Sequence, residues 1–159
     1  MLAHTERISS SAPLDPAIIR VLVVDDNPFF RASLISWIAR HPNIASCGYA
    51  DSPLTALQSI ARHSPDIVLL DLQLRDGTGF DLLLVLQAAK HQPRVIVLSQ
   101  QDENIFAERS IRAGARGYVH KDEAMDVMLV AIHEVLRGGV HLSAELRRRL
   151  PASLIRTGS

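Results

Sequence analysis

The stretch DIVLLDLQL, residues 66–74, places one carboxylate inside what is otherwise the pattern of a buried strand. Four apolar residues lead into Asp71, and apolar residues resume at Leu72. Removing an ionised carboxylate from water costs free energy unless another group compensates its charge. The position of Asp71 therefore indicates that this strand leaves the core here and enters a polar site.

Similar β-rich runs occur along the chain and alternate with longer helical patterns. The predicted strands are 18–24, 44–50, 66–70, 94–99 and 116–120, and the predicted helices are 28–41, one that starts at Pro53, 80–90, 102–113 and 122–137. Five strands that alternate with five helices predict an α/β fold with a parallel sheet and helices on both faces. Unbroken apolar runs fit this arrangement, because central parallel strands are covered on both sides.

Composition excludes several classes of protein. Apolar residues make up 47% of the chain and charged residues 21%, which is typical of a soluble globular domain. Lys and Arg total 17, as do Asp and Glu, so no overall charge favours nucleic acid or an anionic membrane. The lone Cys47 excludes an intrachain disulfide, and no apolar run approaches the ~20 residues that span a bilayer. We therefore expect a cytoplasmic protein with no membrane partner.

The two ends of the chain differ in pattern from the middle. Residues 1–17 are rich in Ser and Pro, have no secretory signal and are expected to form a flexible leader. Residues 18–138 are expected to form the folded domain. Residues 139–159 begin with the second glycine of the pair Gly138-Gly139 and are interpreted as a linker or the start of a tail helix, capped by Ser143.

The chemistry is expected at the ends of the strands. Asp25 and Asp26 follow the first predicted strand, Asp71 the third, Ser99 ends the fourth, and Lys121 follows the fifth. In an open α/β sheet the ligand crevice lies beyond the carboxyl ends of the strands. The sequence therefore predicts three carboxylates, a hydroxyl and an ammonium in one crevice.

Such a cluster of acids needs cations. Two like charges about 4 Å apart repel by roughly 4 kcal/mol at an effective dielectric of 20. Lys121 supplies one cation, and Mg²⁺, which prefers carboxylates, water and phosphate oxygens, is the natural second. A carboxylate nucleophile, a metal, a Lys and a hydroxyl are sufficient parts for phosphoryl transfer.

With these residues in place, the chain resembles the receiver domain of bacterial two-component response regulators. The matching motifs are the Asp25-Asp26 pair, Asp71 in VLLDLQLRDGTGFDLL, Ser99 at the end of VIVLS and Lys121 in AGARGYVHK. The resemblance covers residues 20–137. DDNPFFR, GARGYVHKD and GGVHLSAELRRRL are most similar to the NarL/FixJ (LuxR-type) subfamily, in which a helix-turn-helix DNA-binding domain follows the receiver; we expect no such domain within these 159 residues.

The resemblance implies a fold and a switch. The fold is the flavodoxin-like, doubly wound (βα)5 arrangement with strand order 2-1-3-4-5. A sensor histidine kinase would donate a phosphoryl group to Asp71 while Asp25, Asp26, Asp71 and the backbone carbonyl of Gln73 hold Mg²⁺. Ser99 and Lys121 would bind the phosphoryl group, and Tyr118 occupies the aromatic position that changes rotamer on activation. The output would be transcription, with DNA bound only through the absent domain. Such a chain is a regulator and not an enzyme, since it catalyses only its own phosphotransfer and dephosphorylation.

Three glutamines stand at positions that bear on the site in the resembled family, and one of them departs from its usual pattern. Gln100 stands beside Ser99, where the family prefers a small residue, and could crowd the phosphoryl group. Gln73 and Gln101 occupy positions that usually influence how water reaches the acyl phosphate. A receiver-like interaction module that is not phosphorylated therefore stays open.

Two further readings of the residues stay open as well. A small Mg²⁺-dependent phosphatase with an aspartyl nucleophile, of the haloacid dehalogenase kind, would also use a strand-end Asp, but Asn27 stands where that family has a second Asp.

The helix at 122–137 carries more apolar surface than one side of a sheet needs. A homodimer contact through this helical surface and simple core burial explain that surface equally well.

Overall fold

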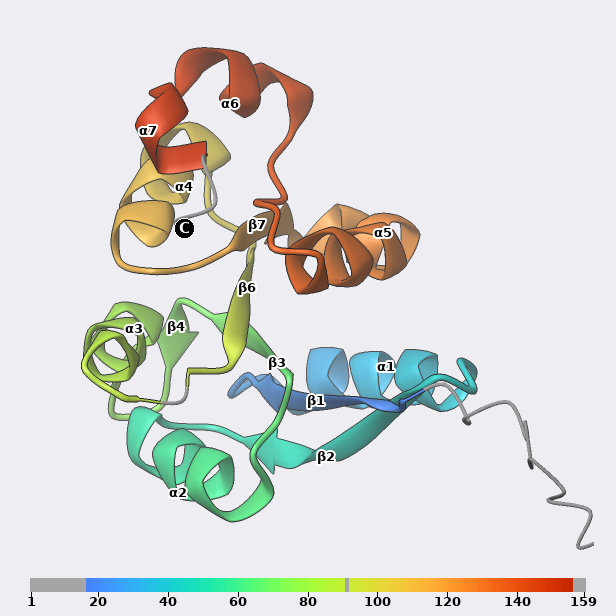
Figure 1. Ribbon diagram of the computed structural model, residues 1–159. Helices are drawn as coiled ribbons and strands as arrows, with labels where there is room; N and C mark the ends of the chain where they lie inside the picture. The colour runs from blue at the N-terminus through green and yellow to red at the C-terminus, as the bar shows by residue number, and fades with distance from the viewer. Residues whose placement is uncertain (1–16, 91, 156–159) are drawn as a thin grey trace, which may run out of the picture.

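Five parallel strands form the central sheet in the order β2-β1-β3-β6-β7 (Figure 1). The computed structural model describes residues 17–90 and 92–155, so all of the expected leader except residue 17 lies outside the described residues. The strands are β1 (Ile19–Val24), β2 (Ile44–Ala50), β3 (Ile67–Asp71), β6 (Arg94–Ser99) and β7 (Gly117–His120). When these five strands are numbered alone, the order is the expected one, and the prediction of a five-stranded parallel sheet is confirmed.

The register of the central strands aligns their carboxyl ends. Val24 pairs with Leu70, and Asp71 pairs with Leu98 on the next strand. The last four residues of β1 and the first four of β3 are almost completely buried, as expected for strands that are covered on both faces. The residues that follow β1, β3 and β6 consequently emerge at the same edge of the sheet.

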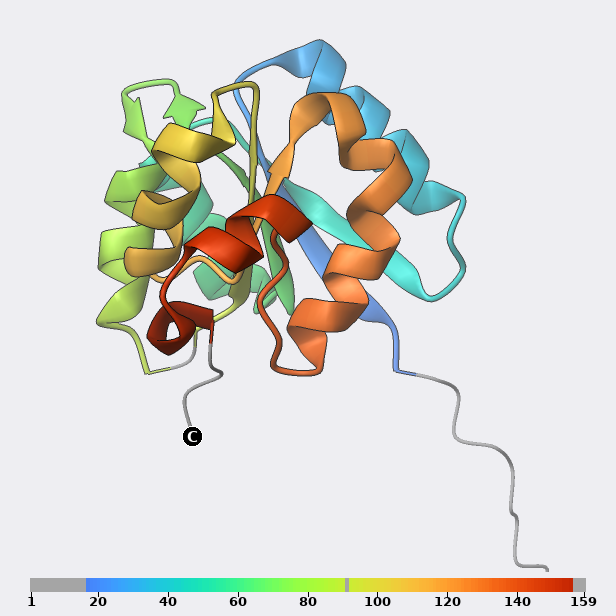
Figure 2. The same cartoon turned by 90° about the horizontal axis from the view of Figure 1, so that it is seen from above.

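Helices cover both faces of the sheet (Figure 2). One face packs against α1 (Pro28–Ala39) and α5 (Ala124–Leu136), and the other against α2 (Pro53–His63), α3 (Gly79–Gln87) and α4 (Glu103–Arg112). Each face has its own apolar core, one built around Leu34, Trp37 and Met128, the other around Leu82, Leu83 and Tyr118. The sheet therefore holds the loops of its carboxyl edge between two packed layers.

Side-chain caps fix where three of the helices begin. The Asn27 side chain accepts hydrogen bonds from the backbone N–H groups of Phe29 and Phe30, and Pro28 occupies the first helical turn. Ser52 and Thr78 form capping boxes at α2 and α3. Because α1 starts within a few residues of β1, the loop that carries Asp25 and Asp26 is short and closely held.

The structure corrects several predicted boundaries. The helix predicted at 80–90 ends at Gln87, because the N–H groups of Ala88 and Ala89 bond only three residues back, to Val85 and Leu86, and the side-chain amide of Gln92 donates to the carbonyls of Gln87 and Ala89. The helix predicted at 28–41 ends at Ala39, and the one predicted at 122–137 starts as a 3₁₀ turn, η1 (Lys121–Glu123), before α5. A short hairpin of β4 (Gln73–Leu74) and β5 (Gly77–Thr78), which was not predicted, fills the loop after Asp71.

The segment after α5 returns to the sheet. It contains α6 (Ala144–Arg149), which Ser143 caps as predicted, and α7 (Ala152–Ile155). In Figure 2 this segment, coloured red, lies between α4 and α5. Among the described residues, no helix has both the length and the apolar character that crossing a membrane requires.

Candidate functional site

Three carboxylates gather at the carboxyl edge of the sheet, where β1 and β3 end. One side-chain oxygen each from Asp25, Asp26 and Asp71 lies within 4.8 Å of the others. Asp25 and Asp71 are only 2% and 7% exposed, whereas Asp26 is exposed. The cluster thus has two buried acids and one acid at its mouth.

Lys121 places a cation between the two buried acids. Its Nζ lies 2.8 Å from Oδ2 of Asp25 and 3.0 Å from Oδ2 of Asp71, and its side chain is 7% exposed. Nζ also lies 4.4 Å from the centre of the Phe30 ring, within the range of a cation–π contact. Lys121 is held by two charges and one aromatic face.

Backbone N–H groups bind the second oxygen of each buried acid. The N–H of Asn27 donates to Oδ1 of Asp25 at 2.8 Å, and the N–H of Gln73 donates to Oδ1 of Asp71 at 3.2 Å. The guanidinium of Arg31 donates to the backbone carbonyl of Asp25 at 3.0 Å. Both buried carboxylates are therefore oriented by fixed partners on two sides.

Burial and charged neighbours shift the pKa values of Asp71 and Lys121. Burial raises the pKa of Asp71 above its usual range, while the hydrogen bond and charge of Lys121 act in the opposite direction. Burial acts to lower the pKa of Lys121, but its bonds to Asp25 and Asp71 outweigh this effect and raise the pKa. Lys121 is therefore a cation at neutral pH and compensates the buried acids.

The donor set fits a hard divalent cation. The three carboxylates carry two more charges than the one ammonium that forms ion pairs with them, and every candidate ligand atom of the cluster is a carboxylate oxygen. Mg²⁺ takes one or two carboxylates and several waters, and the exposed Asp26 offers such a ligand at the mouth of the site. The role predicted for the Gln73 carbonyl stays a prediction.

Ser99 and Tyr118 are joined through one residue of the loop after β6. Ser99 is 1% exposed, and its Oγ accepts a hydrogen bond from the Gln101 N–H at 3.0 Å. The Tyr118 hydroxyl donates to the Gln101 carbonyl at 2.9 Å, and burial raises the pKa of Tyr118 above its usual range. The predicted hydroxyl and the predicted aromatic residue thus contact the same loop residue.

The three glutamines lie around the site at different depths. Gln73 and Gln100 are exposed, and Gln101 is half-buried. The Gln100 carbonyl lies 3.1 Å from Nε2 of His120, while the Gln100 side chain makes no hydrogen bond among the described residues. Their predicted influence on the access of water stays a prediction.

Two neighbouring residues of the site were missed by the sequence reasoning. Phe30 lies against Lys121, and Arg31 binds the Asp25 carbonyl while its guanidinium stacks over the Tyr49 ring, 4.0 Å from its centre. In the sequence both residues belong to the motif DDNPFFR, but neither was assigned a role at the site. The signal that could have found both residues is their place in the first turns of a helix that starts directly after an acidic pair.

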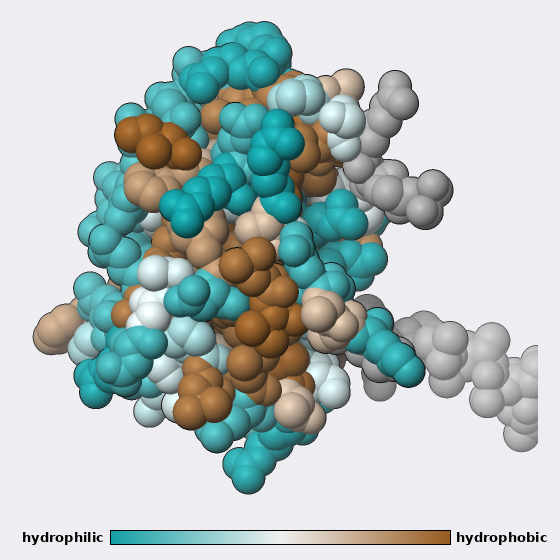
Figure 3. Space-filling model, turned by 90° about the vertical axis from the view of Figure 1, so that its left-hand side faces the viewer, coloured by the Kyte–Doolittle hydropathy of each residue, from teal (hydrophilic) through white to brown (hydrophobic). Residues whose placement is uncertain are grey.

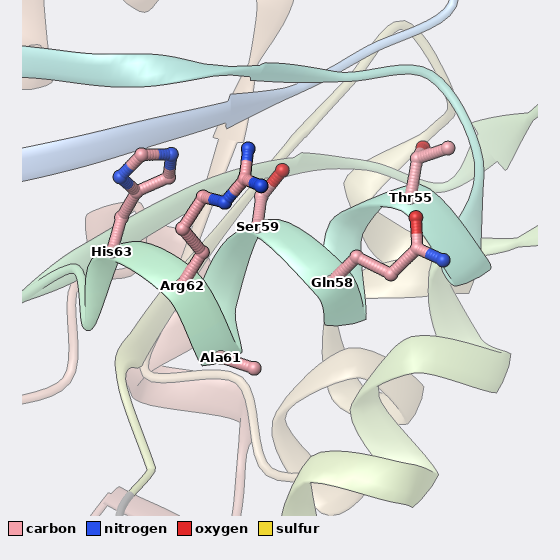
Figure 4. A pocket seen from close by; sticks show the side chains of 6 residues that line it. All are labelled: Thr55, Gln58, Ser59, Ala61, Arg62 and His63. Carbon is pink, nitrogen blue, oxygen red and sulfur yellow. The ribbon is translucent and has the colours of Figure 1, made fainter.

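Away from the acidic cluster, the surface has a groove over α2 and exposed apolar side chains on several helices. A groove over α2 is lined by Thr55, Gln58, Ser59, Ala61, Arg62 and His63, and Figure 4 shows that all six come from this one helix. Apolar side chains form a stripe on the face that carries α2 and α3 (Figure 3), where Leu54, Leu84 and Val85 are exposed. On α5, Leu129 and Val130 are exposed, and the homodimer contact stays a prediction.

Comparison with known proteins gives one family. The family model described as "Response regulator receiver domain" matches residues 21–133. The transcriptional regulatory protein MctR of Rhizobium johnstonii is 29% identical over 141 residues, which cover 89% of this chain and 66% of that protein. This chain spans little more than half of the length of other curated relatives, with 58% and 56% in two cases.

The chain is also similar to solved structures of response regulators. A LuxR-family two-component response regulator from Aurantimonas sp. SI85-9A1 has a TM-score of 0.76 and 26% identity, over 83% of this chain and 94% of that chain. The signal receiver domain of a response regulator named NarL from Mycobacterium tuberculosis has a TM-score of 0.72 and 28% identity, over 77% of this chain and 99% of that chain.

Proposed function

Because the chain belongs to the response regulator receiver domain family, with NarL/LuxR-type relatives, we propose that it is a phosphoacceptor switch whose acceptor is Asp71. The observation that carries the proposal is Lys121, which bridges Asp25 and Asp71 at 2.8 and 3.0 Å beside an exposed third acid. The donor is the phosphohistidine of a sensor histidine kinase, and the chain acts in the cytoplasm.

In the proposed reaction a carboxylate oxygen of Asp71 attacks the phosphorus of phosphohistidine. The new P–O bond forms as the P–N bond breaks, and the imidazole nitrogen keeps the electron pair of the broken bond. Lys121 neutralises charge on a phosphoryl oxygen, since it is already held against Asp71. Asp25 and Asp26 would hold Mg²⁺, and the bound ion would supply further positive charge near the transferring group.

The switch follows from the charge that the reaction adds. A phosphoryl group brings about 1.5–2 negative charges at neutral pH and new acceptor oxygens. Ser99 Oγ turns from the Gln101 N–H toward one of these oxygens. Because the Gln101 carbonyl accepts the Tyr118 hydroxyl, a shift of this loop changes the environment of β7. The output of the whole protein is transcription, through a DNA-binding domain of the kind that LuxR-type regulators carry.

The experiment that tests the proposal uses acetyl phosphate with Mg²⁺ and intact mass measurement. A single phosphoryl adduct that resists acid and is labile to base is expected on the wild type. The adduct should be absent from Asp71→Asn and present on the control Asp126→Asn, which changes an exposed acid on α5. Steady hydrolysis without an adduct would instead indicate a phosphatase. Absence of both would indicate an interaction module that is not phosphorylated.

A further inference from the structure

Arg31 lies beside the acidic cluster but contacts the backbone of an acid and not its carboxylate. Its guanidinium donates to the carbonyl oxygen of Asp25 at 3.0 Å, and it forms no ion pair with any acid among residues 17–90 and 92–155. A cation in this position holds the backbone of Asp25 in place and leaves both carboxylate oxygens to other partners. The contact is therefore that of a group that orients the loop after β1.

Tyr49 of β2 holds the guanidinium of Arg31 from another direction. The guanidinium carbon lies 4.0 Å from the centre of the Tyr49 ring, although this ring is 57% exposed. A planar guanidinium stacks well on an aromatic face and loses less hydration there than an ammonium would. The Arg31 side chain is therefore fixed between the end of β1 and the neighbouring strand.

A bulge in β2 brings Tyr49 to this side of the sheet. In the ladder between β1 and β2, Val21 pairs with Ser46. Two residues further along β1, Val23 pairs with Tyr49, which is three residues further along β2. The bulged stretch includes Gly48, whose φ of +124° is a conformation that favours glycine. Because side chains alternate along a strand, the extra residue turns the Tyr49 ring to the face that carries α1.

The peptide group that Arg31 binds also sets the position of Asp26. The carbonyl of Asp25 belongs to the peptide bond that joins these two acids. The Asp26 side chain is exposed and makes no hydrogen bond or ion pair with any residue that the structure describes. Its carboxylate is therefore placed by the backbone alone. Arg31 is the side chain that bonds to this part of the backbone.

We propose that Arg31, stacked on Tyr49, is a positioning residue that orients the Asp25–Asp26 peptide for binding of a divalent cation. The proposal rests on the phosphoacceptor function proposed above, in which this ion assists the transfer. Groups that orient a metal ligand commonly change metal affinity by roughly 10–100-fold. Electrostatics alone gives the opposite expectation, because the guanidinium and the ion repel each other. The sign of the effect therefore separates the two roles.

Titration of the full chain with Mn²⁺, in the absence of a phosphodonor, tests this proposal. Mn²⁺ prefers the same oxygen ligands as Mg²⁺, and its electron paramagnetic resonance signal measures the free ion. Arg31→Met keeps a long side chain but removes the donor and the charge, and its Kd for Mn²⁺ should rise about tenfold. Arg31→Lys keeps a cationic donor and should stay close to the wild type. The control Arg40→Ala removes an exposed Arg at the other end of α1 and should match the wild type.

Two variants of Tyr49 test the same contact from β2. Tyr49→Ala removes the ring under the guanidinium and should raise the Kd for Mn²⁺ by about threefold, the effect of a cation–π contact at an exposed site. Tyr49→Phe keeps the ring and should bind like the wild type. Because the ring is exposed, neither change should unfold the chain, and circular dichroism of each sample checks this. The Tyr49 pair thus tests the proposal even where Arg31→Met folds poorly.

The outcomes separate failure of the positioning role from failure of the proposed function. Binding of Mn²⁺ by Arg31→Met that equals or exceeds wild-type binding overturns the positioning role and leaves the phosphoacceptor function intact. A loss in Arg31→Lys as large as that in Arg31→Met overturns the donated hydrogen bond as its cause. Equal Kd values for Tyr49→Ala and Tyr49→Phe overturn the contribution of the ring. Wild-type protein without any binding that Asp26→Asn removes overturns the cation site of the proposed function, and this proposal with it.

Discussion

Nζ of Lys121 lies 3.0 Å from Oδ2 of Asp71, although the two residues are 50 positions apart in the chain. Lys121 follows β7 and Asp71 ends β3, and in the sheet β6 lies between these strands. The side chain therefore reaches across the end of β6 to make this contact, and it reaches Asp25 beyond β1 as well. A single cation therefore joins residues at the carboxyl ends of three strands, β1, β3 and β7.

Loss of this cation should destabilise the protein. Lys121→Ala leaves Asp25 and Asp71 buried without their partner, and breaking a buried ion pair from one side costs about 3 kcal/mol. We expect the free energy of unfolding, measured by urea denaturation without Mg²⁺, to fall by about this amount. The control is Lys90→Ala, which changes the only other Lys, an exposed one. Equal stability of the two variants would contradict the role of Lys121 as counterion.

Divalent cation should stabilise the folded state through the acids. Binding to the folded state alone raises the free energy of unfolding by about 2.7 kcal/mol when the ligand is at 100 times its Kd. We expect Mg²⁺ to raise the stability of the wild type relative to EDTA at constant ionic strength. Asp26→Asn should lose most of this gain, and Asp126→Asn should keep it. An equal response to Mg²⁺ in both variants would show that the ion acts elsewhere.

The aromatic contact of Lys121 can be isolated with a double-mutant cycle. The Phe30 ring lies 4.4 Å from Nζ, whereas its neighbour Phe29 is 84% exposed. The coupling free energy between Phe30→Leu and Lys121→Met should be about 1 kcal/mol, the size of a partly shielded cation–π contact. The same cycle with Phe29→Leu should give a coupling near zero. Similar couplings in the two cycles would argue against a specific contact with Phe30.

The sheet and the acidic cluster could be predicted because both depend on local patterns. Apolar runs such as 67–70 specify buried strands, and the parallel arrangement brings the residues after them to one edge. Asp25, Asp26, Asp71 and Lys121 could therefore be placed together before any contact was known. The structure agrees with this placement, since the three acids lie within 4.8 Å of one another and Lys121 contacts two of them.

Other features escaped prediction for physical reasons. The hairpin of β4 and β5 has two residues in each strand, too few to show a period in the sequence. At the end of α3 the Gln87 carbonyl accepts a hydrogen bond from the side chain of Gln92, a residue outside the helix. The docking of Val140, Leu142 and Leu146 depends on the surface of α4 and β7, which forms only after the fold is complete. Such contacts lie outside what the spacing of residues can indicate.

The buried hydroxyl of Tyr118 should make part of the stability depend on alkaline pH. Tyr118→Phe removes the hydrogen bond to Gln101 and should cost about 1 kcal/mol at pH 7. Burial raises the folded-state pKa of Tyr118 above 10.0, so its contribution is complete below the unfolded pKa and is lost as pH rises through the folded pKa. The stability difference between wild type and Tyr118→Phe should therefore shrink above pH 10. A difference that grows with pH would contradict the burial effect.

The central claim is that the phosphoryl group resides on Asp71. The most direct measurement is reduction of the phosphorylated protein with borohydride, which converts a phosphorylated aspartate into homoserine, followed by peptide mass mapping. We predict homoserine at position 71 in the wild type and at no position in Asp71→Asn. Homoserine at Asp25 or Asp26 with position 71 unchanged would contradict the account.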